Sequence, residues 1–185
     1  MFIQTEATPN PATLKFIPGK PVLPGGTRDY RSAEAAGESP LAERLFSIAN
    51  VSGVFFGQDF ITVSKSGGEW PHLKPAILGQ IMDHYLSGEP MLTDEKPQAV
   101  AGAEDYDEAD GETVATIKQL LDTRVRPAVA QDGGDITFHA FREGVVYLHM
   151  KGACSGCPSS TATLKNGIEN LLRHFVPEVS EVRPV

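Results

Sequence analysis

The chain has 185 residues, 41% of them hydrophobic, and a formal net charge of −8 at pH 7. No apolar run approaches the roughly 18 residues of a membrane span, and neither half carries a basic stripe that would suit nucleic acid. Residues 1–10 have no basic start and no apolar core of a secretory signal, and they lack the Arg-rich character of a transit peptide. We therefore expect one or two domains of a cytoplasmic protein that works without membrane or nucleic acid.

The first segment, residues 1–91, mixes strand and helix patterns and is expected to form a small α+β domain. Ser39 and Pro40 are suited to the N-cap and first turn of a helix. A second helix is expected over 71–86, with Gly88 ending it. Strands are predicted over 2–6, 13–17, 51–56 and 60–63.

The middle segment, residues 92–110, is acidic and poor in large apolar side chains. Between Thr93 and Asp110 seven acids face one base, which accounts for most of the net charge of the chain. Such a stretch buries too little apolar surface to offset the entropy of ordering it, and its like charges favour extension. We therefore predict a flexible linker over 92–110.

The last segment, residues 111–185, is predicted to fold as helix, strand, strand, helix, strand. The helices are expected over 112–130, where Pro127 would kink or shorten the first, and over 158–175. The strands are expected over 136–141, 145–150 and 179–182, with a turn at 132–135 before the first of them. Two helices would then cover one face of a three-stranded sheet. The whole chain is thus expected to be α+β, with two small α/β-sandwich domains.

Cys154 and Cys157 are the only cysteines, and they form one C-x-x-C run. Two thiols at this spacing converge on one point, so they can share a metal or form a disulfide. Pro158 fits the first turn of the following helix, which places Cys157 at the helix N-terminus, where a thiolate is favoured. Two thiolates do not complete a four-ligand site, so the remaining ligands must come from elsewhere.

The C-x-x-C run alone leaves four interpretations open. The first is an iron–sulfur cluster, which normally takes four thiolates and would be completed by a second copy of the loop across a two-fold axis. The second is a zinc-binding interaction module. The third is a dithiol–disulfide oxidoreductase. The fourth is a pair of buried structural cysteines, which the neighbouring glycines and serines disfavour because they indicate an exposed loop.

Other polar residues are weaker candidates. His139 and His149 lie on neighbouring predicted strands and are expected on the outer face, more as packed or solvated residues than as ligands. Asp132 and Asp135 are interpreted as turn formers rather than a catalytic pair. The remaining histidines are expected at the surface of helices: His72, His84 and His174.

Several motifs in order resemble those of the Nfu/NifU family of iron–sulfur scaffold proteins. In the last segment these are Arg124-Val-Arg-Pro127, Gln131-Asp-Gly-Gly-Asp135 and Gly152-Ala-Cys-Ser-Gly-Cys-Pro-Ser-Ser-Thr161, followed by Thr163-Leu-Lys165. Residues 1–90 resemble the Nfu N-terminal domain through Thr5-Glu-Ala-Thr-Pro-Asn-Pro11, Thr13-Leu-Lys-Phe16 and Gly53-Val-Phe-Phe56.

The resemblance implies a non-enzymatic carrier. It implies that Cys154 and Cys157 ligate a [4Fe–4S] cluster between the subunits of a homodimer, with [2Fe–2S] or zinc as lesser alternatives. It implies apo iron–sulfur clients and upstream assembly proteins as partners, and a docking role for the N-terminal domain.

Overall fold

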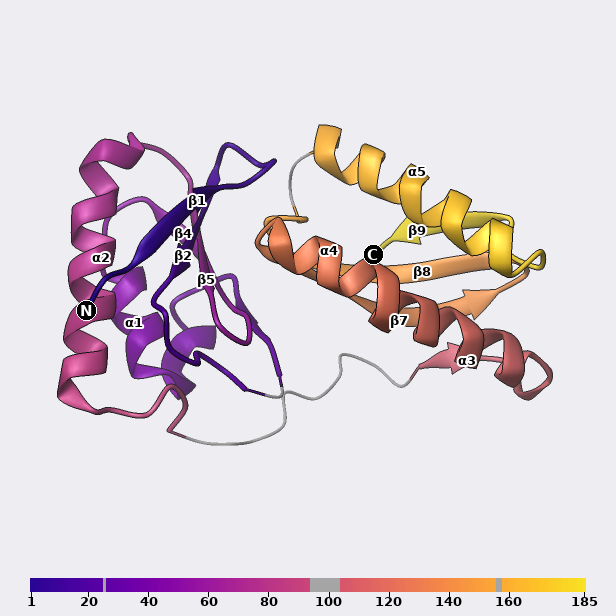
Figure 1. Ribbon diagram of the computed structural model, residues 1–185, viewed down its shortest axis with the longest axis horizontal. Helices are drawn as coiled ribbons and strands as arrows, with labels where there is room; N and C mark the ends of the chain where they lie inside the picture. Colours follow the sequence, from indigo (N-terminus) through magenta and orange to yellow (C-terminus); the bar gives the residue numbers. More distant parts are fainter. Residues whose placement is uncertain (25, 94–103, 156–157) are drawn as a thin grey trace. The chain divides into compact units, whose positions relative to one another are not determined.

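The computed structural model describes residues 1–24, 26–93, 104–155 and 158–185 (Figure 1). The chain divides into two compact units, Met1–Pro97 and Gln98–Val185. Each unit has its own sheet, its own helices and its own buried apolar cluster. The α+β class predicted from the sequence is confirmed.

The first unit contains a five-stranded sheet of order β1-β2-β5-β4-β3, in which every neighbouring pair is antiparallel. The predicted strands are present, and β3 was not anticipated because its three residues are too short to show an alternating pattern. The strands are β1 (Gln4–Ala7), β2 (Thr13–Ile17), β3 (Arg28–Tyr30), β4 (Val51–Phe56) and β5 (Ile61–Lys65).

Two helices pack on this sheet, α1 (Pro40–Phe46) and α2 (Trp70–Ser87), and a short 3-10 helix, η1 (Ala35–Glu38), precedes α1. The Ser39 hydroxyl caps α1 by accepting a hydrogen bond from the Ala42 backbone N–H at 3.2 Å, as the sequence predicts. Gly88 ends α2 in the left-handed conformation with φ of 73°. The inner faces of helices and sheet share one apolar cluster, which includes Phe16, Phe56 and Ile81.

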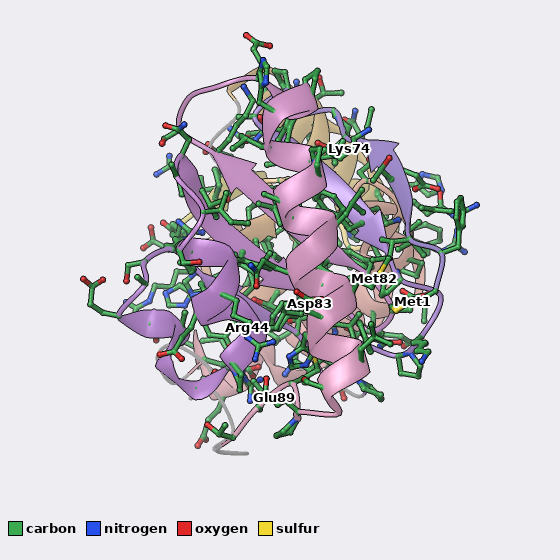
Figure 2. The ribbon with its side chains drawn as sticks, turned by 90° about the vertical axis from the view of Figure 1, so that its left-hand side faces the viewer. Met1, Arg44, Lys74, Met82, Asp83 and Glu89 are labelled. Atoms are coloured by element: carbon green, nitrogen blue, oxygen red, sulfur yellow. The ribbon has the colours of Figure 1, made fainter. Side chains whose placement is uncertain are left out.

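An ion pair joins α1 to the residue just beyond the end of α2. Figure 2 shows α2 with Arg44 and Glu89 labelled near its C-terminal end, where Arg44 Nη2 lies 2.6 Å from Glu89 Oε2. Behind this pair His84 is 1% exposed, and it lies 3.9 Å from the same carboxylate. The expectation that His84 lies at the surface is wrong, because α2 turns this position toward α1 and the pair.

The second unit contains a four-stranded sheet of order β6-β7-β8-β9. The pair β7–β8 is antiparallel and joined by the two-residue turn Glu143-Gly144, both with positive φ, while β6 and β9 pair in parallel. A β-bulge interrupts the β7–β8 register between Phe138 and Ala140. The strands are β6 (Asp105–Tyr106), β7 (Gly134–Arg142), β8 (Val145–Gly152) and β9 (Glu181–Pro184).

The first helical segment of this unit is interrupted by a π-helical turn. It runs from α3 (Gly111–Leu120) through η3 (Leu121–Val125) into α4 (Arg126–Gln131). Pro127 lacks a backbone N–H and its ring would clash with the preceding turn, so the wider π turn accommodates the proline without breaking the helix. The sequence predicts that Pro127 kinks or shortens this helix, and the structure shows a π turn just before the proline.

The helices α3–α4 and α5 (Pro158–Phe175) lie on the same face of the sheet (Figure 1). Their buried side chains form one cluster with the inward residues of β7 and β8, including Ile117, Ile136, Leu148 and Leu172. The opposite face of the sheet is not part of that cluster. This confirms the predicted two-layer arrangement, with a fourth strand added.

The fourth strand comes from the segment predicted as linker. Within 92–110, residues 94–103 lie outside the described part of the chain, while Asp105–Tyr106 form β6 and Glu108–Asp110 form a 3-10 helix, η2. Arg142 forms an ion pair with Asp105, and Tyr106 packs edge-on against Phe138. The flexibility of the linker and the domain boundaries at 91 and 110 stay predictions. None of the helices described here is long and apolar enough to span a membrane.

Candidate functional site

The cysteine loop follows β8 and is positioned by two paired glycines. Gly134 at the start of β7 faces Gly152 at the end of β8. Gly152 has a φ of 63°, which turns the chain out of the strand at a conformation that other residues rarely adopt. The Ala153 N–H then donates to the Gly133 carbonyl at 3.2 Å, which holds the loop against the turn before β7.

Gly134 leaves the space that the Cys154 thiol occupies. A Cβ at position 134 would lie 2.5 Å from Cys154 Sγ and 2.8 Å from the Lys151 carbonyl oxygen. The Thr161 hydroxyl of α5 donates to the Cys154 carbonyl at 3.1 Å. The turn before β7, residues 152–154 and Thr161 of α5 therefore pack together around Cys154.

Cys154 is only 6% exposed and belongs to the apolar cluster of the unit. Burial raises the pKa of its thiol to about 12, and the negative charges of Asp132 and Asp135 act in the same direction. In the ligand-free chain this thiol is therefore protonated at neutral pH. The expectation of an exposed loop does not hold for Cys154, because the two glycines let the thiol lie over β7.

Cys157 and Gly156 lie outside the described residues, so the expected thiolate at the helix N-terminus stays a prediction. The helix itself begins at Pro158, as the sequence predicts. Among the residues that the structure describes, no three His, Cys, Asp or Glu side chains are grouped so as to hold a metal ion. Cys154 is thus the one predicted ligand whose surroundings can be described.

An ion pair beside the loop was missed by sequence reasoning. Arg126 of α4 binds Asp135 of β7 through two hydrogen bonds, Nε to Oδ1 at 2.9 Å and Nη2 to Oδ2 at 3.0 Å. Asp135 is 4% exposed, so this pairing compensates the burial of its charge. The only sequence signal was an Arg and an Asp nine positions apart, which a turn-forming interpretation of Asp135 leaves unexplained.

The other histidines separate into two groups. His139 and His149 lie side by side, with ring centroids 4.5 Å apart, and neither belongs to the core cluster. His72 and His174 are exposed, as expected.

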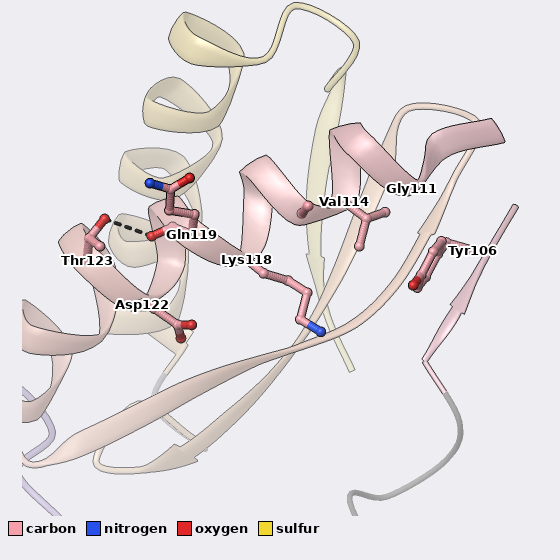
Figure 3. A pocket seen from close by; sticks show the side chains of 8 residues that line it. Tyr106, Gly111, Val114, Lys118, Gln119, Asp122 and Thr123 are labelled. Atoms are coloured by element: carbon pink, nitrogen blue, oxygen red, sulfur yellow. Dashed lines mark hydrogen bonds between the residues drawn. The ribbon is translucent and has the colours of Figure 1, made fainter. Parts of the chain in front are cut away.

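A groove of about 500 Å³ lies between α3 and β6 (Figure 3). Lys118 crosses its edge and donates to both oxygens of Glu104, at 2.7 and 2.8 Å. The dashed line in Figure 3 is the hydrogen bond from the Thr123 hydroxyl to the Gln119 carbonyl. None of the lining residues is a cysteine or histidine, so the groove is separate from the cysteine loop. They are Tyr106, Gly111, Val114, Ala115, Lys118, Gln119, Asp122 and Thr123.

Both units match known families. Residues 3–88 match the family described as Scaffold protein Nfu/NifU N terminal, and residues 117–183 match the NifU-like domain. The chain is 54% identical over 187 residues to the "NFU1 iron-sulfur cluster scaffold homolog, mitochondrial" of Homo sapiens, covering 100% of this chain and 72% of that protein. It is 53% identical to the "NifU-like protein 4, mitochondrial" of Arabidopsis thaliana, covering 98% of this chain and 65% of that protein.

The chain is also similar to a solution NMR structure of a NifU-like protein from Saccharomyces cerevisiae, at 26% identity and a TM-score of 0.47, over 51% of this chain and 87% of that one. Across the curated relatives named here the chain spans 65% to 72% of their length. The family matches and close relatives define a scaffold protein. The chain belongs to the Nfu/NifU family, which confirms the recognition made from the sequence.

The expected cytoplasmic location is wrong by this comparison. The human and Arabidopsis relatives are named as mitochondrial proteins, which points to the mitochondrion instead. The expectation rested on the absence of targeting features in residues 1–10.

Proposed function

We propose that this chain is a scaffold and carrier that holds a [4Fe–4S] cluster through Cys154 and Cys157 and passes it to apo client proteins without catalytic turnover. The observation that carries the proposal is that the only two cysteines share one loop. Since a cluster normally takes four thiolates, two loops facing across a two-fold axis in a homodimer would supply them. The relatives named as iron–sulfur cluster scaffolds support iron–sulfur chemistry over the alternatives.

The surroundings of Cys154 favour a cluster that is readily transferred to a client protein. The thiol must lose its proton to the solvent when its sulfur binds iron, and burial beside Asp132 and Asp135 makes that thiolate unfavourable. In transfer, the iron–sulfur bond to Cys154 breaks as a client thiolate binds the same iron, and Cys154 takes up a proton again. No electron moves in this exchange, and the buried neutral thiol stabilises the cluster-free carrier.

The same burial restricts the dithiol alternative, in which Cys157 rather than Cys154 would have to be the attacking thiolate. A redox dithiol attacks as a thiolate, so its activity depends on a pKa near or below the ambient pH. A pKa of about 12 leaves Cys154 a poor nucleophile at neutral pH. We therefore place Cys154 as a ligand rather than a redox nucleophile.

The partners follow from the carrier role. Apo iron–sulfur proteins would receive the cluster, and upstream assembly proteins would supply it. The N-terminal unit, which shares no residue with the cysteine loop, would select or dock these partners.

Anaerobic reconstitution with iron and sulfide tests the proposal. We expect about four iron and four sulfide per two chains, and a cluster-dependent dimer by size-exclusion chromatography with light scattering. Cys154→Ala and Cys157→Ala should each abolish cluster formation, while Ser155→Ala, which keeps both thiols, should not. A cluster yield that is unchanged in Cys154→Ala would overturn the proposal.

A transfer assay separates a carrier from a storage protein. The loaded dimer is mixed with an apo iron–sulfur protein and a chelator that traps free iron. We expect the client to gain its cluster in the presence of the chelator. Client maturation that is abolished by the chelator would indicate release of free iron and would contradict direct transfer. Zinc in freshly isolated protein, with no cluster after reconstitution, would favour the zinc module instead.

A further inference from the structure

Residues 104–106 add a short strand to one edge of the second sheet. Asp105 stands opposite Ala140 and Tyr106 opposite Phe141, in parallel pairing. Since the sheet order is β6-β7-β8-β9, β7 would be the edge strand without this addition. An edge strand presents N–H and C=O groups that can pair with a further extended chain. Residues 104–106 therefore occupy a position in which a segment of another protein can also pair with the sheet.

Two cations flank this position. The Lys118 ammonium of α3 donates to both carboxylate oxygens of Glu104, at 2.7 and 2.8 Å. Arg142, at the end of β7, forms an ion pair with Asp105. Both pairs are at the surface, with side chains that are 32% to 63% exposed. Exposed ion pairs contribute little to stability, so the two cations favour acidic side chains at this edge without holding the chain's own acids tightly.

The aromatic residue of this short strand covers apolar surface only in part. The Tyr106 ring meets that of Phe138 edge-on at a centroid separation of 6.2 Å, and Tyr106 remains 38% exposed. Figure 3 shows Tyr106 beside the groove of about 500 Å³ that Val114 and Lys118 of α3 also line. A strand of two residues with one partly exposed ring buries little apolar surface, so a longer segment that also fills the groove can displace it.

We propose that the β7 edge and the adjoining groove are a docking site for an extended segment of a partner protein in which two acidic residues precede an aromatic one. Residues 104–106 occupy this site in the unbound chain and show the chemistry that it accepts. The partner's acids pair with Lys118 and Arg142, and its ring enters the groove. Because residues 104–106 compete, the apparent affinity is lowered by the fraction of chains in which the site is covered. Docking at this edge needs no bound cluster.

Titration followed by nuclear magnetic resonance tests the site in the full chain without a cluster, so the result is independent of cluster binding. The probe is the peptide Glu-Asp-Tyr-Asp-Glu with blocked ends, which copies residues 104–108. The release variant is Asp105→Lys, Tyr106→Gly, which puts a cation beside Arg142 and removes the ring. We expect saturable shifts of the amides of residues 140–142, with a dissociation constant at least about tenfold lower in the release variant than in the parent.

Charge changes in the release background identify the contacts. Lys118→Glu and Arg142→Glu should each weaken peptide binding at least about fivefold, since each places a like charge opposite an acid of the peptide. Lys165→Glu is the matched control, because Lys165 pairs with Glu181 of β9 at the other edge of the sheet. It should leave binding within about twofold, because solvent screens a distant charge. A peptide with alanine in place of tyrosine should bind more weakly than the probe.

The single variant Tyr106→Ala, which keeps both acids, repeats the comparison if circular dichroism shows the double variant to be unfolded. Three results would overturn the proposal: no saturable shift of residues 140–142 in any folded variant, equal affinity in the parent and the release variants, or an equal loss in Lys165→Glu. Light scattering gives a fourth. A parent dimer that the release variants lack would show that the same segment of a second copy, rather than a partner protein, occupies the site.

Discussion

Gly134 and Cys154 share one small volume at the start of β7. We expect Gly134→Ala to destabilise the second unit by about 1–3 kcal/mol, because the added Cβ would lie 2.5 Å from Sγ and 2.8 Å from the backbone oxygen of Lys151. Hydrogen exchange of the β7 and β8 amides measures the loss. Gly167→Ala is the matched control, since α5 leaves open space there, and alanine should stabilise the helix by about 0.5–1 kcal/mol. Equal protection in both variants would contradict the close packing.

Asp132 and Asp135 raise the pKa of the Cys154 thiol through their negative charge. Asp135 is held by Arg126, whereas Asp132 is exposed and can be changed without breaking a buried pair. We expect Asp132→Asn to lower this pKa and speed the reaction of Cys154 with a disulfide reagent on the order of two- to tenfold, since one pKa unit is tenfold in thiolate. The rate is measured in the Cys157→Ser chain, where Cys154 is the sole thiol. Glu143→Gln, at the far end of β7, is the control, and an equal increase there would exclude a local effect.

At the scale of elements, the fold was predictable where the signal is local. Ser39 caps α1 and Gly88 ends α2 as the sequence predicts, because capping depends on the residue and its immediate neighbours. The strands of the hairpin 134–152 follow from alternation and from the turn at Glu143-Gly144. The predicted helix 112–130 is correct in extent, and only its π turn was not specified.

The elements that were not predicted depend on contacts distant in sequence. Tyr106 looked like one aromatic in an acidic linker, yet it pairs in parallel with β7 and packs on Phe138. The burial of His84 likewise depends on how α1 meets α2. At the candidate site, Cys154 was found from its spacing to Cys157, whereas its burial depends on Gly134 at the start of a separate strand.

The packing of α1 against α2 predicts a pH dependence of the first unit. Burial and the neighbouring Arg44 lower the pKa of His84 below its usual value, and Glu89 opposes this only in part. An unfolded histidine has a pKa of about 6.5, so below that pH the unfolded chain takes up a proton that the folded chain does not. Stability should therefore fall as the pH drops through 6.5 toward the lower folded pKa.

Replacing His84 by leucine should reduce this pH dependence. Trp70 is the only tryptophan and belongs to α2, so its fluorescence reports unfolding of the first unit alone. We expect the loss of unfolding free energy between pH 7.5 and pH 5.5, measured with urea, to be smaller in His84→Leu than in the parent. His72→Gln, at an exposed position of the same helix, should behave like the parent. A pH dependence unchanged in His84→Leu would place its origin elsewhere.

At the scale of the whole molecule, the two apolar clusters share no residue. A carrier that docks clients with one unit and delivers a cluster with the other benefits if each unit folds without the other. Cooperative unfolding requires shared packing, so separate cores predict two separate transitions.

Two core truncations test this independence. Ile81 and Ile117 are both fully buried, one in each cluster, and truncation of either to alanine should cost about 2–5 kcal/mol. We expect Ile81→Ala to lower the urea midpoint of Trp70 fluorescence, and Ile117→Ala to leave that midpoint unchanged. Far-ultraviolet circular dichroism, which reports both units, should register each substitution. A Trp70 midpoint that shifts as far in Ile117→Ala as in Ile81→Ala would mean that the units unfold together, which would contradict their independence.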